Sequence, residues 1–160
     1  MSLQRLDRVF DCYRIGDPDG RFPIYDATGS RLFPGRWNTS ETPVIYAGEY
    51  YSTAMLEKLA QGSGRIPPNQ HYIRITVPNG VSYEMVTGDT LPQWSDRDRL
   101  AAQDFGSAWA RELRSAILIV PSYVARIERN VLINPRHDEA RAITHELPQP
   151  VWWDERLFSS

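Results

Sequence analysis

The sequence contains little cysteine, few histidines and no long hydrophobic run, and each shortage excludes a class of protein. Cys12 is the only cysteine among 160 residues, so no intrachain disulfide can form and a reducing, cytoplasmic setting is expected. The histidines His71, His137 and His145 are scattered without zinc-ligand spacing, so no metal site is expected. The longest apolar run, residues 116–121, is far too short to span a bilayer, so no membrane association is expected.

An excess of positive charge and the common nucleotide motifs are also missing. The chain carries 18 basic and 20 acidic residues, for a net charge of −2, which argues against direct binding of nucleic acid. Neither a P-loop nor G-x-G-x-x-G is present, so a nucleotide site would have to use side chains more than a glycine cradle. The absence of G-x-S-x-G argues against a hydrolase with a serine nucleophile.

The residues that are present predict one α+β domain spanning residues 1–160. Apolar residues make up 41% and charged residues 24% of a chain long enough to build its own core. Helical and strand patterns do not alternate strictly, so we expect a mixed sheet core with flanking helices rather than a doubly wound sheet. Expected strands cover residues 6–15, 44–47, 72–77, 81–86, 116–120 and 131–133, and expected helices cover residues 52–60 and 95–113.

Local patterns add finer expectations about these elements. The turn residues 78–80 predict that the strands on either side pair as a hairpin. Ser52 or Thr53 is expected to cap the first helix, and Ser95 with Asp98 resembles a capping box for the second.

The first helix carries an apolar stripe that predicts its orientation. The members of this stripe are Met55, Leu56 and Leu59. Glu57 lies roughly 140° from the middle of the stripe, so this glutamate is not expected at a core position of the helix.

Residues 35–61 form a turn, a strand and a helix, and each offers one candidate site residue. Arg36 is either a surface arginine with a carboxylate partner or a preorganised ligand for phosphate or carboxylate. Tyr46 is either a core aromatic or a ring that stacks on a planar ligand. Glu57 is either a solvated helical glutamate or a carboxylate that stabilises an oxocarbenium ion.

Two residues further along the chain are weaker candidates for the same site. Ser122 ends a buried strand after a proline, where it is either a turn residue or a member of a site. Asn134 precedes a proline, where its side chain either marks a turn or bridges two loops.

Motifs in order along nearly the whole chain resemble the RES domain family, named for its arginine, glutamate and serine. Each motif is weak alone, and the identification depends on their order. The motifs are Tyr13-Arg14-Ile15, Gly35-Arg36-Trp37-Asn38, Val44-Ile45-Tyr46-Ala47, Ala54-Met55-Leu56-Glu57, Val120-Pro121-Ser122, Asn130-Val131-Leu132-Ile133-Asn134-Pro135-Arg136-His137 and Trp153-Asp154-Glu155-Arg156-Leu157-Phe158. Glu155 stands where the family pattern has proline, a departure that bears on how the C-terminal segment packs.

The resemblance implies a bacterial type II toxin with a fold similar to ADP-ribosyltransferase toxins. It implies cleavage of the nicotinamide–ribose bond of NAD+ by phosphorolysis or hydrolysis, with NAD+ as substrate, inorganic phosphate as a candidate co-substrate, and no cofactor. The implied partner is an Xre-type antitoxin with a helix-turn-helix domain, in a complex that allows a toxin homodimer. Transfer of ADP-ribose to a protein, or a binding module that has lost catalysis, stays open as an alternative.

The resemblance also assigns roles to individual residues. The implied catalytic residues are Arg36, Tyr46, Glu57 and Ser122, with Tyr46 stacking on nicotinamide. The implied ligands of NAD+ or phosphate are Arg14, Arg36, Trp37 and Asn134, and Asn134 also fits a scaffolding role.

Overall fold

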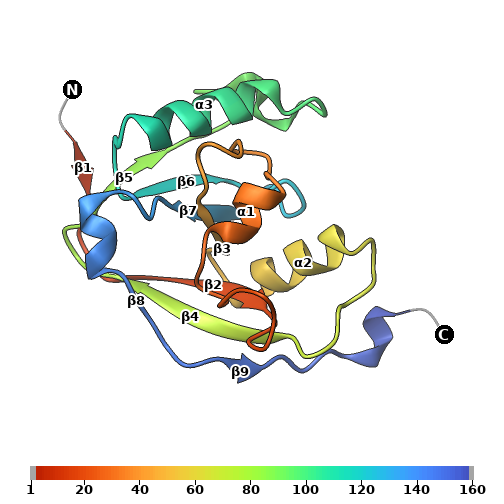
Figure 1. The fold of residues 1–160 in the computed structure, drawn as a ribbon. Helices are drawn as coiled ribbons and strands as arrows, with labels where there is room; N and C mark the ends of the chain where they lie inside the picture. The colour runs from red at the N-terminus through yellow and green to blue at the C-terminus, as the bar shows by residue number, and fades with distance from the viewer. Residues whose placement is uncertain (1–2, 159–160) are drawn as a thin grey trace.

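The computed structural model describes residues 3–158, and its strands and helices confirm the expected α+β class (Figure 1). The strands are β1 (Gln4–Arg5), β2 (Phe10–Gly16), β3 (Ile45–Gly48), β4 (His71–Val77), β5 (Ser82–Met85), β6 (Ile117–Pro121), β7 (Arg129–Ile133), β8 (Thr144–His145) and β9 (Gln149–Pro150). The α-helices are α1 (Thr28–Leu32), α2 (Tyr51–Gln61) and α3 (Leu100–Arg111). Short 3-10 turns cover Pro92–Ser95, Asp138–Ala142 and Glu155–Leu157.

All the strands join one mixed sheet. Their order is β1-β5-β6-β7-β3-β2-β4-β8, and β9 also pairs with β4. The β5–β6 pair is parallel, whereas the other neighbours are antiparallel. The sheet curls, so that β5, β6 and β7 lie on one side of the molecule and β2 and β4 on the other (Figure 1). Helix α3 covers the side formed by β5, β6 and β7, and α2 packs against β2 and β3.

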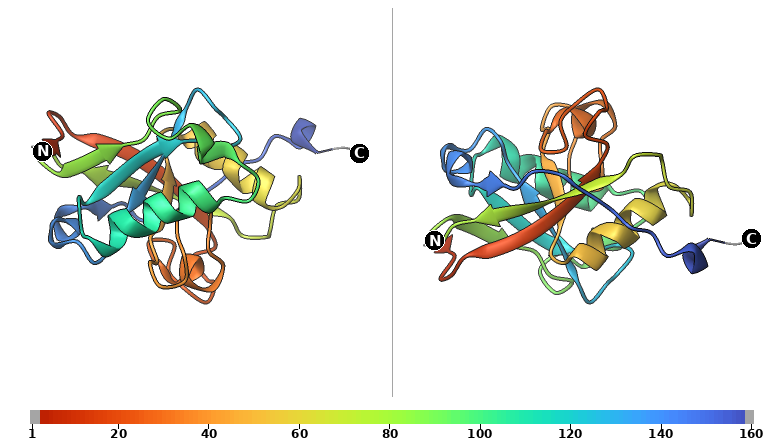
Figure 2. Two further views of the ribbon diagram at one scale, coloured as in Figure 1. Left: turned by 90° about the horizontal axis from the view of Figure 1, so that it is seen from above. Right: turned by 90° about the horizontal axis from the view of Figure 1, so that it is seen from below.

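The core lies on both faces of the central strands β6 and β7. Alternate residues of these strands face α3, where Leu118, Val120 and Leu132 pack with Trp37 and Trp109. The intervening residues enter a second cluster with β2 and β4, namely Ile117, Ile119, Val131 and Ile133. Burial on both faces explains the unbroken apolar run, and the prediction of a fully buried strand there is confirmed. Figure 2 shows α3 and the β2–β4 pair on opposite sides of these strands.

The predicted hairpin between β4 and β5 is wrong. Strand β4 pairs with β2 along all seven of its residues, whereas β5 lies between β1 and β6 in the other half of the sheet. Residues 78–80 do turn the chain, and Gly80 adopts a φ of 92° that favours glycine. The alternation in β4 correctly marks a half-buried strand, but alternation carries no information about which strand is the neighbour.

The expected caps of both long helices are also wrong. Helix α2 begins at Tyr51 with Tyr50 at its N-cap and no side-chain cap, so Ser52 and Thr53 lie inside the helix, and the Thr53 hydroxyl donates to Glu128. Helix α3 begins at Leu100, five residues later than the predicted capping box, after a 3-10 turn. Its N-cap, Arg99, has a left-handed φ of 63°, and Asp98 Oδ1 accepts from the backbone N–H of Leu100 at 3.0 Å.

Helix α2 follows its apolar stripe only in part. Leu56 is 42% exposed, whereas Met55 and Leu59 are half-buried and Thr53 and Ala54 are buried. The inward stripe, which borders a cavity, consists of four residues at positions i, i+3, i+4 and i+7, namely Ala54, Glu57, Lys58 and Gln61. Glu57 thus lies off the core, as expected, at the wall of a polar cavity.

The C-terminal segment docks on the sheet only in part. Strand β9 pairs with β4, and the backbone N–H of Val151 donates to Gln70 O at 3.0 Å. Beyond this point Trp152 is 76% exposed, and the last 3-10 turn extends away from the body (Figures 1 and 2). Trp153 and Phe158 are half-buried, so the aromatic residues beyond Val151 pack only in part.

Candidate active site

The turn at residues 35–38 fixes one wall of the candidate site. Asn38 is fully buried, and its Oδ1 accepts from the backbone N–H of Gly35 at 2.8 Å and from the Tyr46 hydroxyl at 2.7 Å. The same hydroxyl accepts from the backbone N–H of Trp37 at 3.1 Å. A Cβ at position 35 would lie 2.7 Å from the Tyr46 oxygen, so this close approach requires glycine.

Tyr46 can therefore act on a ligand only through its ring. Its hydroxyl already donates one hydrogen bond and accepts another, and burial raises the pKa of Tyr46. The residue is thus the satisfied, largely buried aromatic of the first sequence interpretation, and its ring also borders a cavity.

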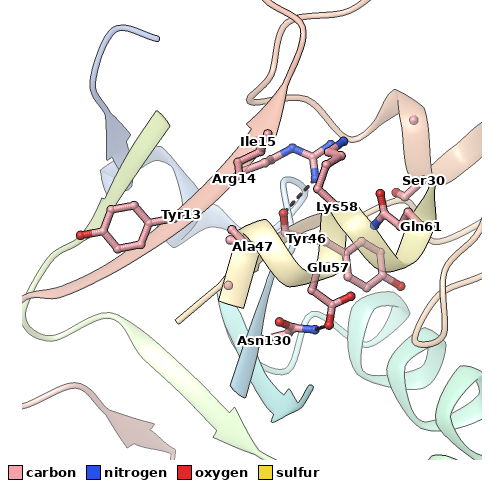
Figure 3. A pocket seen from close by; sticks show the side chains of 13 residues that line it. Tyr13, Arg14, Ile15, Ser30, Tyr46, Ala47, Glu57, Lys58, Gln61 and Asn130 are labelled. Carbon is pink, nitrogen blue, oxygen red and sulfur yellow. Dashed lines mark hydrogen bonds between the residues drawn. The ribbon is translucent and has the colours of Figure 1, made fainter. Parts of the chain in front are cut away.

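A cavity of about 220 Å³ lies between α2 and strands β2 and β3 (Figure 3). Its lining includes three sequence-predicted site residues, Arg14, Tyr46 and Glu57. The other side chains that face it include Tyr13, Ser30, Lys58, Gln61 and Asn130. Residues from five separate segments of the chain thus meet around one space.

Glu57 is held by two hydrogen bonds to the same carboxylate oxygen. Its Oε1 accepts from Ser122 Oγ at 2.9 Å and from Asn130 Nδ2 at 3.0 Å. The buried Ser122 Oγ also accepts from the backbone N–H of Ala125 at 3.0 Å, which directs the hydroxyl proton to Glu57. Within residues 3–158 Glu57 Oε2 makes no hydrogen bond, so the carboxylate is oriented with one oxygen available to a ligand.

Arg14 forms the opposite part of the cavity wall together with Lys58 (Figure 3). Arg14 donates from Nε to Ile24 O at 2.6 Å and from Nη1 to Tyr46 O at 2.8 Å. Burial lowers the pKa of Arg14, and the charge of Asp26 opposes this shift. Burial, followed by the charge of Arg14, likewise lowers the pKa of Lys58.

Arg36 lies outside the cavity, in a group that we call the outer arginine cluster: Arg36, Trp94, Tyr123 and Arg126. Arg36 Nη1 donates to Asp96 O at 2.8 Å and to Trp94 O at 3.2 Å. The Arg36 and Arg126 guanidinium carbons lie 3.8 Å and 4.5 Å from the centre of the Tyr123 ring. Because Tyr123 follows Ser122, this cluster flanks the Glu57 side of the site.

The two remaining sequence candidates support the site without lining the cavity. Trp37 is buried against Trp94, and its carbonyl packs so closely on α3 that a Cβ at Gly106 would lie 1.8 Å away. Asn134 is 1% exposed, and its Nδ2 donates to Ala110 O at 2.9 Å. Asn134 thus marks a turn, since its Oδ1 accepts from the backbone N–H of Arg136 at 3.1 Å, and it also ties β7 to the end of α3.

Sequence reasoning missed Lys58 and Asn130 as members of the site. The sequence signal for Lys58 is the polar stripe of α2 at positions i, i+3, i+4 and i+7. This stripe is easily overlooked beside the neighbouring apolar stripe. Asn130 lies opposite Gly48 of β3 and Val120 of β6, a pairing that only the sheet topology supplies. Its Oδ1 is buried without a hydrogen-bond partner in the described part of the chain.

Residues 3–158 offer neither a metal-ligand cluster nor a membrane-spanning helix. This part of the chain contains no group of three or more potential metal-ligating side chains. It also contains no helix of the length and apolar character that crossing a bilayer requires.

The curled sheet places the protein in a known structural class. A chain from the crystal structure of the M. tuberculosis MbcT–MbcA toxin–antitoxin complex superposes with a TM-score of 0.69 at 16% sequence identity. The match covers 92% of this chain and 86% of that one, so the two share a fold.

The protein belongs to the RES domain family, whose model matches residues 11–154. It is 34% identical to a Prs ADP-ribosylating toxin of Sphingobium sp. strain YBL2, over 81% of this chain and 84% of that protein. It is 30% identical to a Toxin Res of Pseudomonas putida, over 82% and 90% of the two chains. A Toxin Res of Photorhabdus laumondii is also 30% identical, over 69% and 72%. The family predicted from the ordered motifs is confirmed.

Proposed function

We propose that this protein is an enzymatic toxin that cleaves the nicotinamide–ribose bond of NAD+ and passes the ADP-ribosyl group to phosphate or water. The observation that carries the proposal is the Glu57 carboxylate, which Ser122 and Asn130 hold at the wall of a cavity. That cavity also presents the Tyr46 ring and the Arg14 guanidinium. Family membership and relatives named as toxins support the same function.

The chemistry requires few catalytic groups because nicotinamide leaves as a neutral ring. The bond between ribose C1″ and the ring nitrogen breaks with its electron pair going to nicotinamide, and an acceptor oxygen forms the new bond to C1″. Glu57 stabilises the positive charge that develops on the ribose, in the way that carboxylates serve glycoside hydrolysis. The Tyr46 ring offers a face on which nicotinamide stacks.

Under this proposal Arg36 serves the acceptor more readily than the nicotinamide end of the donor. A space of about 220 Å³ encloses only part of a dinucleotide, so the rest of NAD+ extends out of the cavity. Arg36 stands outside the cavity beside Ser122 and Tyr123, where an incoming phosphate can reach a guanidinium. Trp37 and Asn134 then contribute by holding this wall and not by touching the substrate.

Incubation of the purified protein with NAD+, with and without inorganic phosphate, tests the proposal. We expect release of nicotinamide, with ADP-ribose-1″-phosphate as the second product when phosphate is the acceptor and ADP-ribose when water is. Intact NAD+ under both conditions would overturn the proposal.

Transfer of ADP-ribose to a protein is the second candidate function, favoured by the name of the Sphingobium relative as a Prs ADP-ribosylating toxin. Both functions use the same cavity and the same broken bond, and they differ only in the acceptor. With NAD+ labelled in its adenylate half, transfer to protein leaves the label on a macromolecule, whereas phosphorolysis or hydrolysis leaves it on a small molecule.

We further propose that the protein acts in the cytoplasm and is neutralised by an Xre-type antitoxin within a complex that includes a toxin homodimer. The structural neighbour comes from a toxin–antitoxin complex, which supports a protein partner. Growth arrest on expression of the toxin alone, relieved by co-expression of the partner, is the expected result. A chain that is harmless alone would instead favour a binding module without catalysis.

A further inference from the structure

Lys58 is the only lysine in a chain with seventeen arginines, and it lies in the candidate active cavity. It follows Glu57 on the inward stripe of α2, so one helix presents an anion and a cation to the same space. A lysine in the solvated part of a helix would commonly pair with a carboxylate. Within residues 3–158 Lys58 takes part in no ion pair, so its position calls for another explanation.

Lys58 and Arg14 place two positive charges on one part of the cavity wall (Figure 3). Arg14 is held by the carbonyl oxygens of Ile24 and Tyr46, which orient its guanidinium without neutralising its charge. Asp26 is the carboxylate whose charge reaches Arg14, and its Oδ1 already accepts from the backbone N–H of Thr28. Two neighbouring cations that are partly removed from water destabilise the empty site, and an anion bound between them would relieve that cost.

The cavity therefore has a charge polarity of its own. Glu57, held by Ser122 and Asn130, makes one part of the wall negative, whereas Arg14 and Lys58 make another part positive (Figure 3). The dinucleotide of the proposed reaction has the matching polarity, since its pyridinium ring is cationic and its diphosphate is anionic. A bound NAD+ would thus be attracted in one orientation and repelled in the reverse one.

We propose that Lys58, together with Arg14, forms the subsite for the NAD+ diphosphate and thereby directs the nicotinamide riboside end to Glu57 and Tyr46. The inference rests on the proposed function, and it assigns Lys58 to binding and orientation of the substrate and not to bond cleavage. Arg14 provides a fixed guanidinium, and the more flexible ammonium of Lys58 closes on the second phosphate.

Steady-state kinetics of Lys58→Gln and Lys58→Arg test the subsite. Loss of the charge should raise KM for NAD+ by about tenfold or more with a smaller change in kcat, and Lys58→Arg should restore most of the affinity. Cleavage of nicotinamide riboside, which has no phosphate, should be equally slow with wild type and Lys58→Gln. A wild type that cleaves NAD+ beside a Lys58→Gln variant with unchanged KM would overturn the inference and leave the proposed function intact.

Chemical labelling tests the same subsite without turnover. Pyridoxal phosphate with borohydride attaches to lysine, and peptide mapping separates Lys58 from the chain's α-amino group. ADP-ribose or inorganic pyrophosphate should protect Lys58 from labelling, whereas nicotinamide should not. Equal labelling with and without ADP-ribose would overturn the inference, even if the protein proved inactive on NAD+. Thermal unfolding of Lys58→Gln should occur at or above the wild-type temperature, because the variant removes a partly buried charge.

Discussion

The cavity wall at Arg14 and the outer arginine cluster show two ways to hold a guanidinium. Arg14 is enclosed and bonded to two backbone carbonyl oxygens, with Lys58 as its neighbour. Arg36 is also bonded to backbone carbonyls, but its plane lies against the partly exposed ring of Tyr123, with Arg126 near the same ring. The first arrangement suits a ligand that leaves water, and the second suits an anion that arrives from solvent.

Between the two cationic regions lies the Glu57 carboxylate, which is the group that both would serve. Ser122 links them physically, because its hydroxyl bonds Glu57 while its neighbour Tyr123 supports Arg36. Changes on the Arg14 side should therefore impair use of NAD+, and changes on the Arg36 side should impair use of the acceptor.

The largest effect is expected from Glu57→Gln, which removes the charge that both regions serve but keeps the shape and one oxygen acceptor. We expect nicotinamide release from NAD+ to fall by about 10²- to 10³-fold, because an oriented carboxylate acts on charge that develops only in the transition state. Nicotinamide release measured by chromatography is the readout, with Glu112→Gln as a control at an exposed glutamate. An active and folded Glu57→Gln would exclude this carboxylate from the reaction.

Arg14→Gln should give the next largest effect on the use of NAD+. It should also lower the free energy of unfolding. Loss of the guanidinium leaves the carbonyl oxygens of Ile24 and Tyr46 without donors, at a cost of about 1–3 kcal/mol for each buried acceptor. Denaturant titration should show this loss, and calorimetry should show weaker binding of ADP-ribose. Unchanged affinity for ADP-ribose in a folded variant would contradict a ligand role on this side.

Arg36→Gln should impair use of the acceptor, inorganic phosphate, without impairing use of the donor, NAD+. We expect KM for inorganic phosphate to rise by about fivefold to tenfold while KM for NAD+ changes little, since one exposed charge-assisted contact is lost. Arg129→Gln, at another arginine exposed to solvent, serves as the matched control. A rise confined to KM for NAD+ would reverse the assignment of the two cationic regions.

Ser122→Ala should have a moderate effect, because Asn130 still holds the same oxygen of Glu57. We expect kcat to fall by about tenfold with little change in KM, as for a group that orients a catalytic carboxylate. Combining Ser122→Ala with Glu57→Gln should add almost nothing to the loss from Glu57→Gln alone. Fully additive losses would show that Ser122 acts independently of Glu57.

The smallest effect is expected in the pH dependence of NAD+ binding. Burial first, and then the charge of Arg14, lower the pKa of Lys58 from its ordinary value of 10.5. At a pH below this lowered pKa, Lys58 is charged and the affinity for NAD+ is at its highest. The affinity falls as the pH rises through the pKa. Arg14, Tyr46, Glu57 and Asp26 are the other ionisable groups around it, and the raised pKa of Tyr46 keeps the phenol neutral in this range. Lys58→Arg should abolish the pH dependence in a titration of KM, and a variant that keeps it would assign the effect to another group.

Particular residues show how far the sequence could lead. The order of the motifs predicts the family. The strands expected at residues 44–47 and 116–120 lie close to the observed β3 and β6. The apolar stripe of α2 predicts its orientation only in part, because Leu56 is exposed and the polar stripe of the helix borders the cavity. A helical wheel assumes that the apolar side faces the core, and a helix over a polar site departs from that assumption. The partners of Glu57 lie 65 and 73 residues away along the chain, beyond any local pattern.

Six of the strands, helices α2 and α3 and the family could be predicted from local patterns, because periodicity, turn residues and ordered motifs are local properties of the chain, whereas α1, β1, β8 and β9 could not. Only the tertiary structure decided that Arg14, Tyr46, Glu57 and Lys58 share one cavity while Arg36, Trp37 and Asn134 do not. The pairing of β3 with β7 and of β7 with β6 decided that Asn130 meets Glu57. Strand pairing brings together residues far apart in the chain, and its free energy comes from burial on both faces of the sheet.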